Sequence, residues 1–307
     1  MSALENQLCP CKSGLPQNVC CLTLDGFFKR PNTAKVNLQS DYANPGCYAR
    51  ELGYCSRKIS GEHFISDGIL KGYAHMPIVQ GFRWQKEGEE KAIGRASLVS
   101  NILCTNHNNS LSHFDSEVTR LHKAIANFIL DHKAGRLDEN FVIFSGDNIE
   151  RAAVKTLLGG VCSNSMYNGG MPLEFYGDAK NMCLDFLFNG KKWGDQYAGL
   201  YYYPGDEKNP LASNICGLAP LLLDGKVLGA EIYIAGISFL LFLTCPNNFD
   251  NRKVDPVWQR PHQIILTAPG APVKKVLQFS WTMPSSKGWF EIEMSPKLPT
   301  NPVMARV

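Results

Sequence analysis

Four cysteines stand within the first 21 residues of this 307-residue chain, as Cys9-Pro-Cys11 and Cys20-Cys21. The head of the chain, residues 1–24, is too short to build a hydrophobic core, so another interaction has to supply its folding energy. Four thiolates at this spacing can close one tetrahedral zinc shell, and the ion then contributes the free energy that burial cannot. The spacing therefore predicts a structural Zn²⁺ bound by Cys9, Cys11, Cys20 and Cys21.

This cysteine spacing, with Ser13-Gly14 after the first pair, resembles the SEC-C motif, a small zinc-binding module of many bacterial proteins. Lys12 stands where glycine is common in that motif. The resemblance implies zinc binding, whereas the partner binding of such modules does not carry over. The alternative is that the four cysteines are unrelated thiols in a flexible leader.

The chain starts, from Met1 to Gln7, with neither the basic stretch nor the apolar core of a secretory signal peptide. Eleven cysteines without such a signal favour metal ligands over disulfides, because the cytosol keeps thiols reduced. The longest apolar run, Ile232 to Thr244, is interrupted by Gly236 and falls short of the roughly 20 residues that a membrane span needs. We therefore expect a cytoplasmic protein without a membrane segment, and a buried pair of strands at this run.

A second set of metal-ligand residues lies in the interval 47–107. Cys47 and Cys55 form its first half, and Cys104-Thr-Asn-His107 forms its second half. Two ligands from each half would give a closed four-coordinate shell, which is typical of a structural zinc site because no position is left for water. The sequence thus predicts about two zinc ions per chain, one in each cluster.

The residues around this second set resemble the HNH endonuclease superfamily in its zinc-supported form, which has a ββα-metal (treble-clef) core. The likeness rests on Cys47-x7-Cys55-Ser, on Ile59-Ser-Gly-Glu62-His63, and on Ile102-Leu-Cys104-x-x-His107-Asn108-Asn109-x-Leu111. Members often read Glu-His-x-Ile-Pro, and Ser66 stands in place of that proline. The resemblance implies an enzyme that hydrolyses phosphodiester bonds in DNA, with RNA as the second choice of substrate.

Three residue roles combine this resemblance with the chemistry of hydrolysis, which needs an activated water and a cation on the scissile phosphate. His63 is the expected general base, because a neutral imidazole accepts a proton near neutral pH. Glu62 and Asn108 are expected to ligate a catalytic Mg²⁺ or Mn²⁺, with Asn109 as the substitute for Asn108. Neighbouring strand residues point to opposite faces, so Glu62 and His63 can share a site only if the backbone twists locally.

Structural explanations stay open for each of these residues. His63 could be a buried structural histidine, Glu62 a solvated carboxylate, and Asn108 a helix-capping amide. His113 and Asp115 are further catalytic possibilities, although we expect an exposed loop at His113 and a helix cap at Asp115. The alternative function is a catalytically inactive, zinc-stabilised module that binds nucleic acid or protein. A third hypothesis is an adaptor that recruits a partner through the first cluster.

The overall charge does not choose between these functions. Lys and Arg number 31 against 28 Asp and Glu, which leaves a formal net charge of +3. A nuclease can work at this balance if its basic residues gather near the site, since only the local field meets the phosphates. Both motifs are typical of bacterial and phage proteins, so analogy suggests phage defence or a mobile element.

The pattern along the chain predicts an α+β fold in four parts: the zinc motif at 1–24, a linker at 25–46, the HNH domain at 47–138 and a β-rich C-terminal domain at 139–307. In the HNH domain we expect β-like stretches at 74–83 and 91–102 and a helix at 116–131, capped by Asp115 or Ser116. Its apolar residues recur at helical spacing, at Val118, Leu121, Ile125, Phe128 and Ile129.

The C-terminal part is predicted to start with a helix at 147–158, ended by Gly159-Gly160. Strands are predicted at 183–188, 199–203, 219–223, 227–244, 263–267 and 275–281, with a hairpin turn at Asp224-Gly225. Aromatic residues such as Tyr197 to Tyr203 and Trp281 are expected in the sheet core. The same is expected of four single cysteines: Cys162, Cys183, Cys216 and Cys245.

Glu150, Arg151 and Lys155 share one helical pattern in this part. They could face substrate phosphate or only solvent, and we expect a solvated face. No family resemblance covers residues 140–307. Specificity, assembly into a homodimer and contact with a protein partner are the roles left open for this part.

Overall fold

The computed structural model describes residues 7–23, 26–72, 78–80, 82, 84–86, 89–133, 141–168, 171–194, 197–202, 216–244, 258–269, 274–286 and 288–293. Helices and several sheets alternate in them, so the predicted α+β class is confirmed. Cys245 and most of the predicted stretch 74–83 lie outside the described residues.

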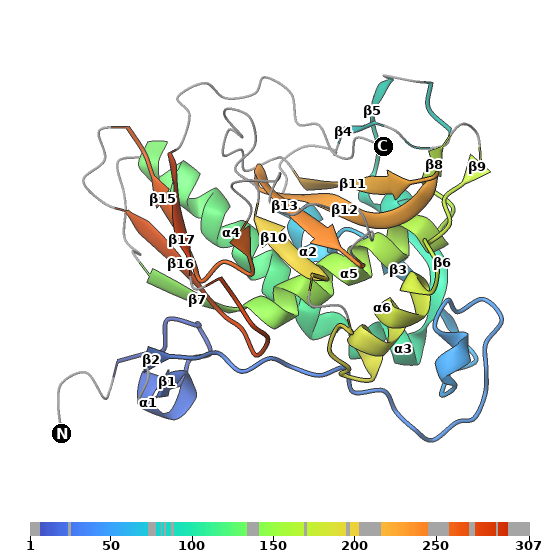
Figure 1. Ribbon diagram of the computed structural model, residues 1–307, viewed down its shortest axis with the longest axis horizontal. Coiled ribbons are helices and arrows are strands. Elements are labelled where there is room, and N and C mark those ends of the chain that lie inside the picture. The colour runs from blue at the N-terminus through green and yellow to red at the C-terminus, as the bar shows by residue number, and fades with distance from the viewer. Residues whose placement is uncertain are drawn as a thin grey trace.

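The N-terminal half consists of short elements followed by one long helix (Figure 1). In chain order the elements are α1 (Gln17–Cys20), β1 (Leu22–Thr23), β2 (Gly26–Phe27), the 3-10 helix η1 (Arg50–Leu52), β3 (Ile59–His63), α2 (Asp67–Leu70), β4 (Ile78–Gln80), β5 (Glu90–Ala92), the 3-10 helix η2 (Arg95–Leu98), β6 (Val99–Cys104), α3 (Thr105–Ser110) and α4 (Ser112–Lys133). Three antiparallel pairs form here: β1 with β2, β3 with β6, and β4 with β5. The predicted stretch 91–102 is therefore two strands, separated by η2.

The C-terminal half supplies the two larger sheets. Its elements are β7 (Phe141–Ser145), α5 (Gly146–Cys162), β8 (Tyr167–Asn168), β9 (Met171–Pro172), α6 (Ala179–Phe188), β10 (Gly199–Tyr202), β11 (Cys216–Leu223), β12 (Lys226–Ile234), β13 (Ile237–Phe242), β14 (Trp258–Gln259), β15 (Gln263–Thr267), β16 (Lys275–Ser280) and β17 (Trp289–Glu293). One sheet has the antiparallel order β11-β12-β13-β10-β14. The other has the order β17-β15-β16-β7, in which β7 and β17 pair in parallel with their neighbours. The predicted hairpin at Asp224-Gly225 is confirmed, since it joins β11 to β12.

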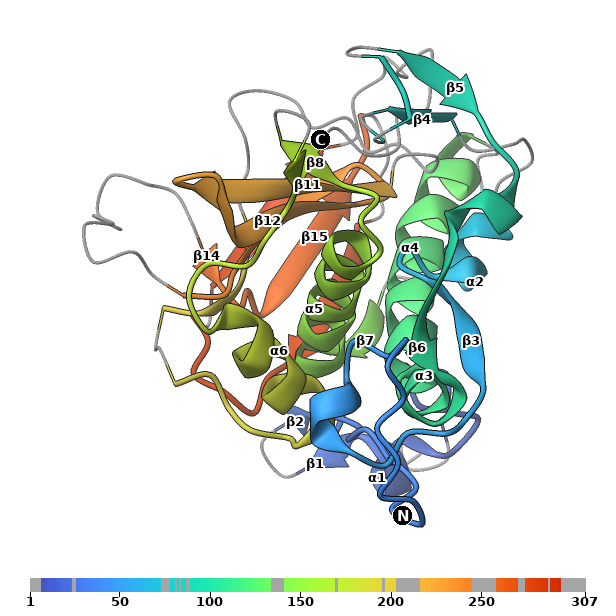
Figure 2. The same cartoon turned by 90° about the vertical axis from the view of Figure 1, so that its right-hand side faces the viewer.

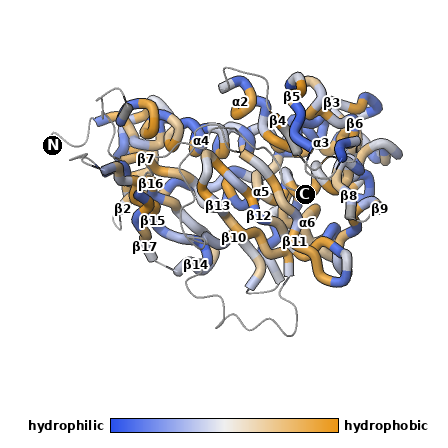
Figure 3. The backbone as a smooth tube through the Cα atoms, turned by 90° about the horizontal axis from the view of Figure 1, so that it is seen from above, coloured by the Kyte–Doolittle hydropathy of each residue, from blue (hydrophilic) through white to orange (hydrophobic). Residues whose placement is uncertain are grey.

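Helix α5 is the central element of the fold. Figure 2 shows it running between α4 and the two large sheets, and it contacts elements of both sides. Nearly all of its residues are buried. Residues of both halves, such as Leu121 and Phe279, belong to one continuous hydrophobic core, and Figure 3 shows apolar segments gathered where α5 meets the strands. The arrangement leaves α5 no solvated face.

The expectation of a solvated face at Glu150, Arg151 and Lys155 is therefore wrong. These side chains are buried, and each has at least one polar partner. Glu150 accepts hydrogen bonds from the Trp193 ring and from Arg260, and Arg151 donates to the carbonyl oxygen of Phe186. All of these partners lie outside the helix, so the helical pattern alone could not reveal them.

Two further predictions about helices are corrected. Helix α5 does not end at Gly159-Gly160 but runs to Cys162. The two glycines allow close packing instead, since a Cβ at Gly159 would lie 2.6 Å from the Cβ of Phe64. The predicted strand 183–188 is part of the helix α6. The prediction was wrong because the periodicity of a short apolar run does not distinguish a buried helix from a buried strand. Cys183 and Cys216 are core residues as expected, and Cys162 is partly buried.

The long helix of the N-terminal half is confirmed, but it starts earlier than predicted. Leu121, Ile125, Phe128 and Ile129 form its buried stripe. Because α4 begins at Ser112, Asp115 lies in its first turn and is not an N-cap. A carboxylate there still favours the helix through the macrodipole. None of the helices in the described ranges combines the length and the apolar character needed to cross a membrane.

Candidate functional site

Cys47, Cys55, Cys104 and His107 converge in the interior, with their ligand atoms within 4.8 Å of one another. The Nδ1 atom of His107 lies 3.2 Å from the Sγ of Cys104, 3.6 Å from that of Cys47 and 3.7 Å from that of Cys55. A tetrahedral ion at about 2.3 Å from sulfur and about 2.0 Å from nitrogen would separate these donors by about 3.5 Å. The cluster therefore fits zinc, in agreement with the prediction.

Local structure explains why the second half of this cluster is preformed. Cys104 ends β6 and caps α3, and its sulfur accepts a hydrogen bond from the backbone N–H of His107. Two residues spaced as Cys-x-x-His at a strand-to-helix junction thus face the same point. Burial lowers the pKa of His107 to about 4, which favours the neutral imidazole that a metal requires.

The first half comes from the loop before β3, which the backbone and Asn44 hold in place. The N–H of Tyr48 donates to the carbonyl oxygen of Ile102 on β6. The side-chain amide of Asn44 donates to the carbonyl oxygens of Ser56 and Arg57. These bonds bring Cys47 and Cys55 over the end of β6, where Cys104 lies.

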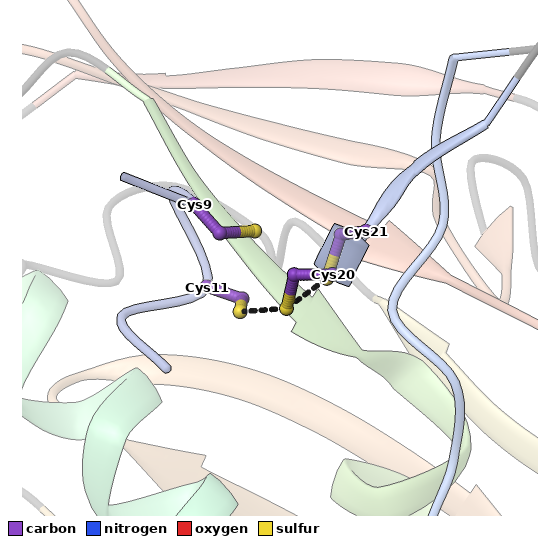
Figure 4. A group of neighbouring side chains, drawn as sticks. All are labelled: Cys9, Cys11, Cys20 and Cys21. Carbon is purple, nitrogen blue, oxygen red and sulfur yellow. Dashed lines mark hydrogen bonds between the residues drawn. The ribbon is translucent and has the colours of Figure 1, made fainter. Parts of the chain in front are cut away.

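The first cluster is also confirmed as a group that could hold zinc. Figure 4 shows Cys9, Cys11, Cys20 and Cys21 facing one another from two segments, again with their sulfurs within 4.8 Å. The sulfur of Cys20 lies 3.3 Å from that of Cys11 and 3.6 Å from that of Cys21. A tetrahedral zinc ion separates two thiolates by about 3.8 Å.

This cluster is packed on the body of the protein rather than extended from it. Three of its cysteines share a small apolar cluster with Ile143 of β7, and the rings of Phe27 and Phe141 lie 5.5 Å apart. The segment lies beside β7 in Figure 1. Lys29, in the predicted linker, pairs with the buried Glu117 of α4 at 2.6 Å.

A cavity of about 230 Å³ is lined by Asn108, the residue that follows His107 of the Cys47, Cys55, Cys104 and His107 cluster. All three predicted catalytic residues line it: Glu62 and His63 from β3, and Asn108 from α3. The remaining lining residues come from β3, from the turn after it, and from α2, α3, α4 and α5: Gly61, Ser66, Asp67, Gly68, Asn109, Ser112, Asp115 and Lys155. The three residues named from the sequence therefore lie around one cavity.

An irregularity in the β3–β6 ladder explains how adjacent strand residues reach one cavity. Ile59 and Ser60 pair with Cys104 and Leu103, whereas Glu62 pairs with Ser100, so the register shifts by one residue between Ser60 and Glu62. Such a shift increases the local twist and redirects side chains. The backbone twist that Glu62 and His63 required is present here.

The two side chains differ in their surroundings. Burial raises the pKa of Glu62, although its ion pair with Lys155 acts in the opposite direction. Burial lowers the pKa of His63, although Asp67 opposes the shift, with its Oδ1 atom 3.7 Å from the imidazole Nε2. His63 is therefore neutral at neutral pH, and Glu62 is neither solvated nor unpaired.

The other predicted polar residues are placed as follows. Asn108 lies inside α3 and is no helix cap: its side-chain nitrogen donates to the hydroxyl of Ser60 at 2.9 Å. Asn109 is exposed at the rim of the cavity. His113 is not in an exposed loop but in α4, where it is half-buried, and burial lowers its pKa.

The sequence analysis missed Asp67, which could have been found because it follows His63 by four positions and α2 places it beside the ring. It named Lys155, but it could not place this residue in the cavity, since α5 is far away in the sequence.

No family model, no curated protein and no solved structure matches this chain.

Proposed function

We propose that this chain is a metal-dependent endonuclease of the HNH type that hydrolyses phosphodiester bonds in DNA, with RNA as the second substrate class. The observation that carries the proposal is that His63, Glu62 and Asn108 line one cavity beside a cluster that fits zinc. The proposal is supported by the antiparallel pair of β3 and β6 and by α3, which directly follows β6, because the resemblance implies a ββα core. Along the chain, α2, β4, β5 and η2 lie between the two strands. A role in phage defence or in a mobile element remains part of this proposal by analogy.

In this proposal His63 takes the proton of the attacking water. Its lowered pKa keeps the imidazole unprotonated at neutral pH, so it can act as a base. Asp67, 3.7 Å from Nε2, would stabilise the imidazolium that forms. The half-buried position of the ring at the cavity wall leaves it accessible to water.

A bound Mg²⁺ or Mn²⁺ would hold the scissile phosphate and stabilise the departing oxygen. The cavity offers oxygen donors of the kind these ions prefer, in the amides of Asn108 and Asn109 and in the carboxylates of Asp67 and Asp115. Mg²⁺ commonly keeps several water ligands, so few protein donors suffice. Glu62 is held by Lys155, and we assign it to anchoring that lysine instead of the ion.

The test is a plasmid-nicking assay with added Mg²⁺ or Mn²⁺, which compares the parent protein with His63→Ala. We expect the parent to convert supercoiled plasmid to the nicked form, and the variant to lose about a hundredfold or more of this rate, as loss of a general base usually costs. The matched control is His132→Ala. His132 lies near the far end of α4, whose first turn lines the cavity, and it should keep full activity.

A second candidate function is favoured by the ion pair of Glu62. A carboxylate that is 1% exposed and bound to Lys155 suits a closed structural network as well as a reactive site. The chain would then be a zinc-stabilised module that binds nucleic acid or protein. This alternative gains if parent and His63→Ala are both inactive with intact zinc content, while a DNA duplex is still retarded in a gel. It is excluded if only His63→Ala is inactive.

A further inference from the structure

Lys155 of α5 reaches the cavity from the half of the chain in which no catalytic residue was expected. Its side chain is only 2% exposed. A lysine is rarely buried to this degree without compensating partners. The ammonium group contacts the Glu62 carboxylate, lies 2.9 Å from Oδ1 of Asp115 and donates to the backbone carbonyl oxygen of His63 at 3.2 Å. These contacts use the three donors of an ammonium group.

The three contacts connect the elements that form the cavity. Glu62 and His63 belong to the end of β3, Asp115 to the first turn of α4, and Lys155 to α5. Glycine packing supports the same alignment, because Gly159, one helical turn after Lys155, lies against Phe64, the residue after His63. The ammonium therefore sits where three elements meet, and it holds the backbone of His63 directly.

The Lys155 ammonium faces two carboxylates, Glu62 and Asp115, and their negative charge keeps the lysine protonated. Burial alone would lower the pKa of Lys155, but the Asp115 and Glu62 carboxylates outweigh it and raise that pKa. A neutral lysine at this position would leave Glu62 buried without a counter-charge. The Asp115 side chain is less buried than that of Glu62, with 30% of it exposed to solvent.

We infer that Lys155 is a positioning residue of the proposed nuclease site: it fixes the main chain at His63, and with it the direction of the imidazole, through the triad with Glu62 and Asp115. The inference rests on the proposed function for its kinetic consequence, but the positioning itself can be measured without activity. It also means that α5, and not only the segment 47–138, belongs to the functional unit.

The experiment uses the full chain and two substitutions. Lys155→Met removes the ammonium at similar side-chain length, but it leaves Glu62 buried and unpaired, which destabilises the fold when this change is made alone. Glu62→Gln removes that charge, and we therefore compare Glu62→Gln alone with the double variant Glu62→Gln/Lys155→Met. Both variants share whatever Glu62 contributes, so any difference between them reports on Lys155.

Two readouts are expected to change. In the nicking assay, kcat of the double variant should be about tenfold to a hundredfold lower than that of Glu62→Gln, with KM unchanged, because misplacing a reacting group by about 1 Å has effects of this size. In ¹³C-labelled protein, the ring signal of His63 should be a single narrow peak in Glu62→Gln, and broadened or multiple in the double variant. A purely structural lysine would alter stability and neither of these readouts.

The outcomes separate this inference from the proposed function. If the His63 signal is equally narrow in both proteins, or if active variants share the same kcat, Lys155 does not position His63 and the inference is wrong. If the parent protein does not cut DNA but the His63 signal changes as expected, the nuclease proposal fails while the positioning role stands.

Discussion

The contact between Gly159 and Phe64 gives a quantitative test of how α5 is seated against the cavity. Replacing Gly159 by alanine would place a Cβ 2.6 Å from the Cβ of Phe64 and 3.2 Å from its Cα. Favourable carbon contacts lie at about 3.5–4.0 Å, so the gap is short by about 1 Å. Neither of these atoms can move without its main chain, so the helix itself has to shift.

The magnitude follows from two opposing effects. Overpacking a tight interior costs about 1–3 kcal/mol, and a contact with main-chain-bound atoms belongs in the upper part of this range. Alanine in a helix interior recovers about 1 kcal/mol relative to glycine. We therefore expect Gly159→Ala to lower the free energy of unfolding by about 1–2 kcal/mol, although the same change in an uncrowded helix would stabilise it.

Denaturant unfolding followed by circular dichroism, at a fixed zinc concentration, measures this difference. The control is Gly94→Ala: Gly94 has φ −68° and ψ 150°, which alanine adopts freely, and no atom lies within 4 Å of the position that the new Cβ would take. This control should be neutral or stabilised by up to about 1 kcal/mol. A Gly159→Ala protein at least as stable as the parent would refute the account of how α5 packs on the cavity wall.

Three further predictions concern the metal clusters and the titratable groups. Metal analysis should find about two zinc ions per chain, and Cys104→Ser or Cys11→Ser should each remove about one; an unchanged zinc content in either variant would exclude its cluster. Glu117→Gln should cost about 2–4 kcal/mol in denaturant unfolding at neutral pH, because the buried carboxylate accepts hydrogen bonds from two cations and from the N–H of Ser145. Burial would raise the pKa of Glu117, but Arg120 and Lys29 lower it below the usual value near 4.5. Ionised Glu117 therefore stabilises the folded protein fully above pH 4.5, and this stabilisation is lost as the pH falls through the lowered pKa of the folded state. The Glu117→Gln variant should lack this pH dependence. The acidic limb of the nicking rate should lie below pH 6.5, because burial lowers the pKa of His63, and a limb above that pH would assign the base to another group.

Some features of the chain could be predicted because they depend on neighbours in the sequence. Cys-x-x-His at a strand-to-helix junction brings its two ligands together locally, and the stripe of α4 repeats at helical spacing. Such spacings predicted both groups that could hold a metal, although the second group also joins two halves that lie far apart along the chain. The turn at Asp224-Gly225 was found for the same reason, since its conformation, with positive φ at both residues, is set by the residues themselves.

Other features depended on partners that the local pattern does not contain. The apolar run in α6 has no periodicity that distinguishes a helix from a strand, so its contacts in the folded protein decide which of the two it forms. Gly159-Gly160 has the pattern of a helix end, and only the close approach of Phe64, Met166 and Leu218 explains why both glycines lie inside α5.

The sequence by itself determined which residues have metal-binding and acid–base chemistry, and which of them lie close along the chain. Only the tertiary structure decided that Lys155 enters the cavity and that Glu62 is not open to solvent. The physical reason is that a charge is buried only beside a counter-charge, and for Glu62 and Lys155 distant parts of the chain supply it. Spacing along the sequence indicates which residues can bind one metal ion together. It does not indicate which distant side chain neutralises a buried charged side chain.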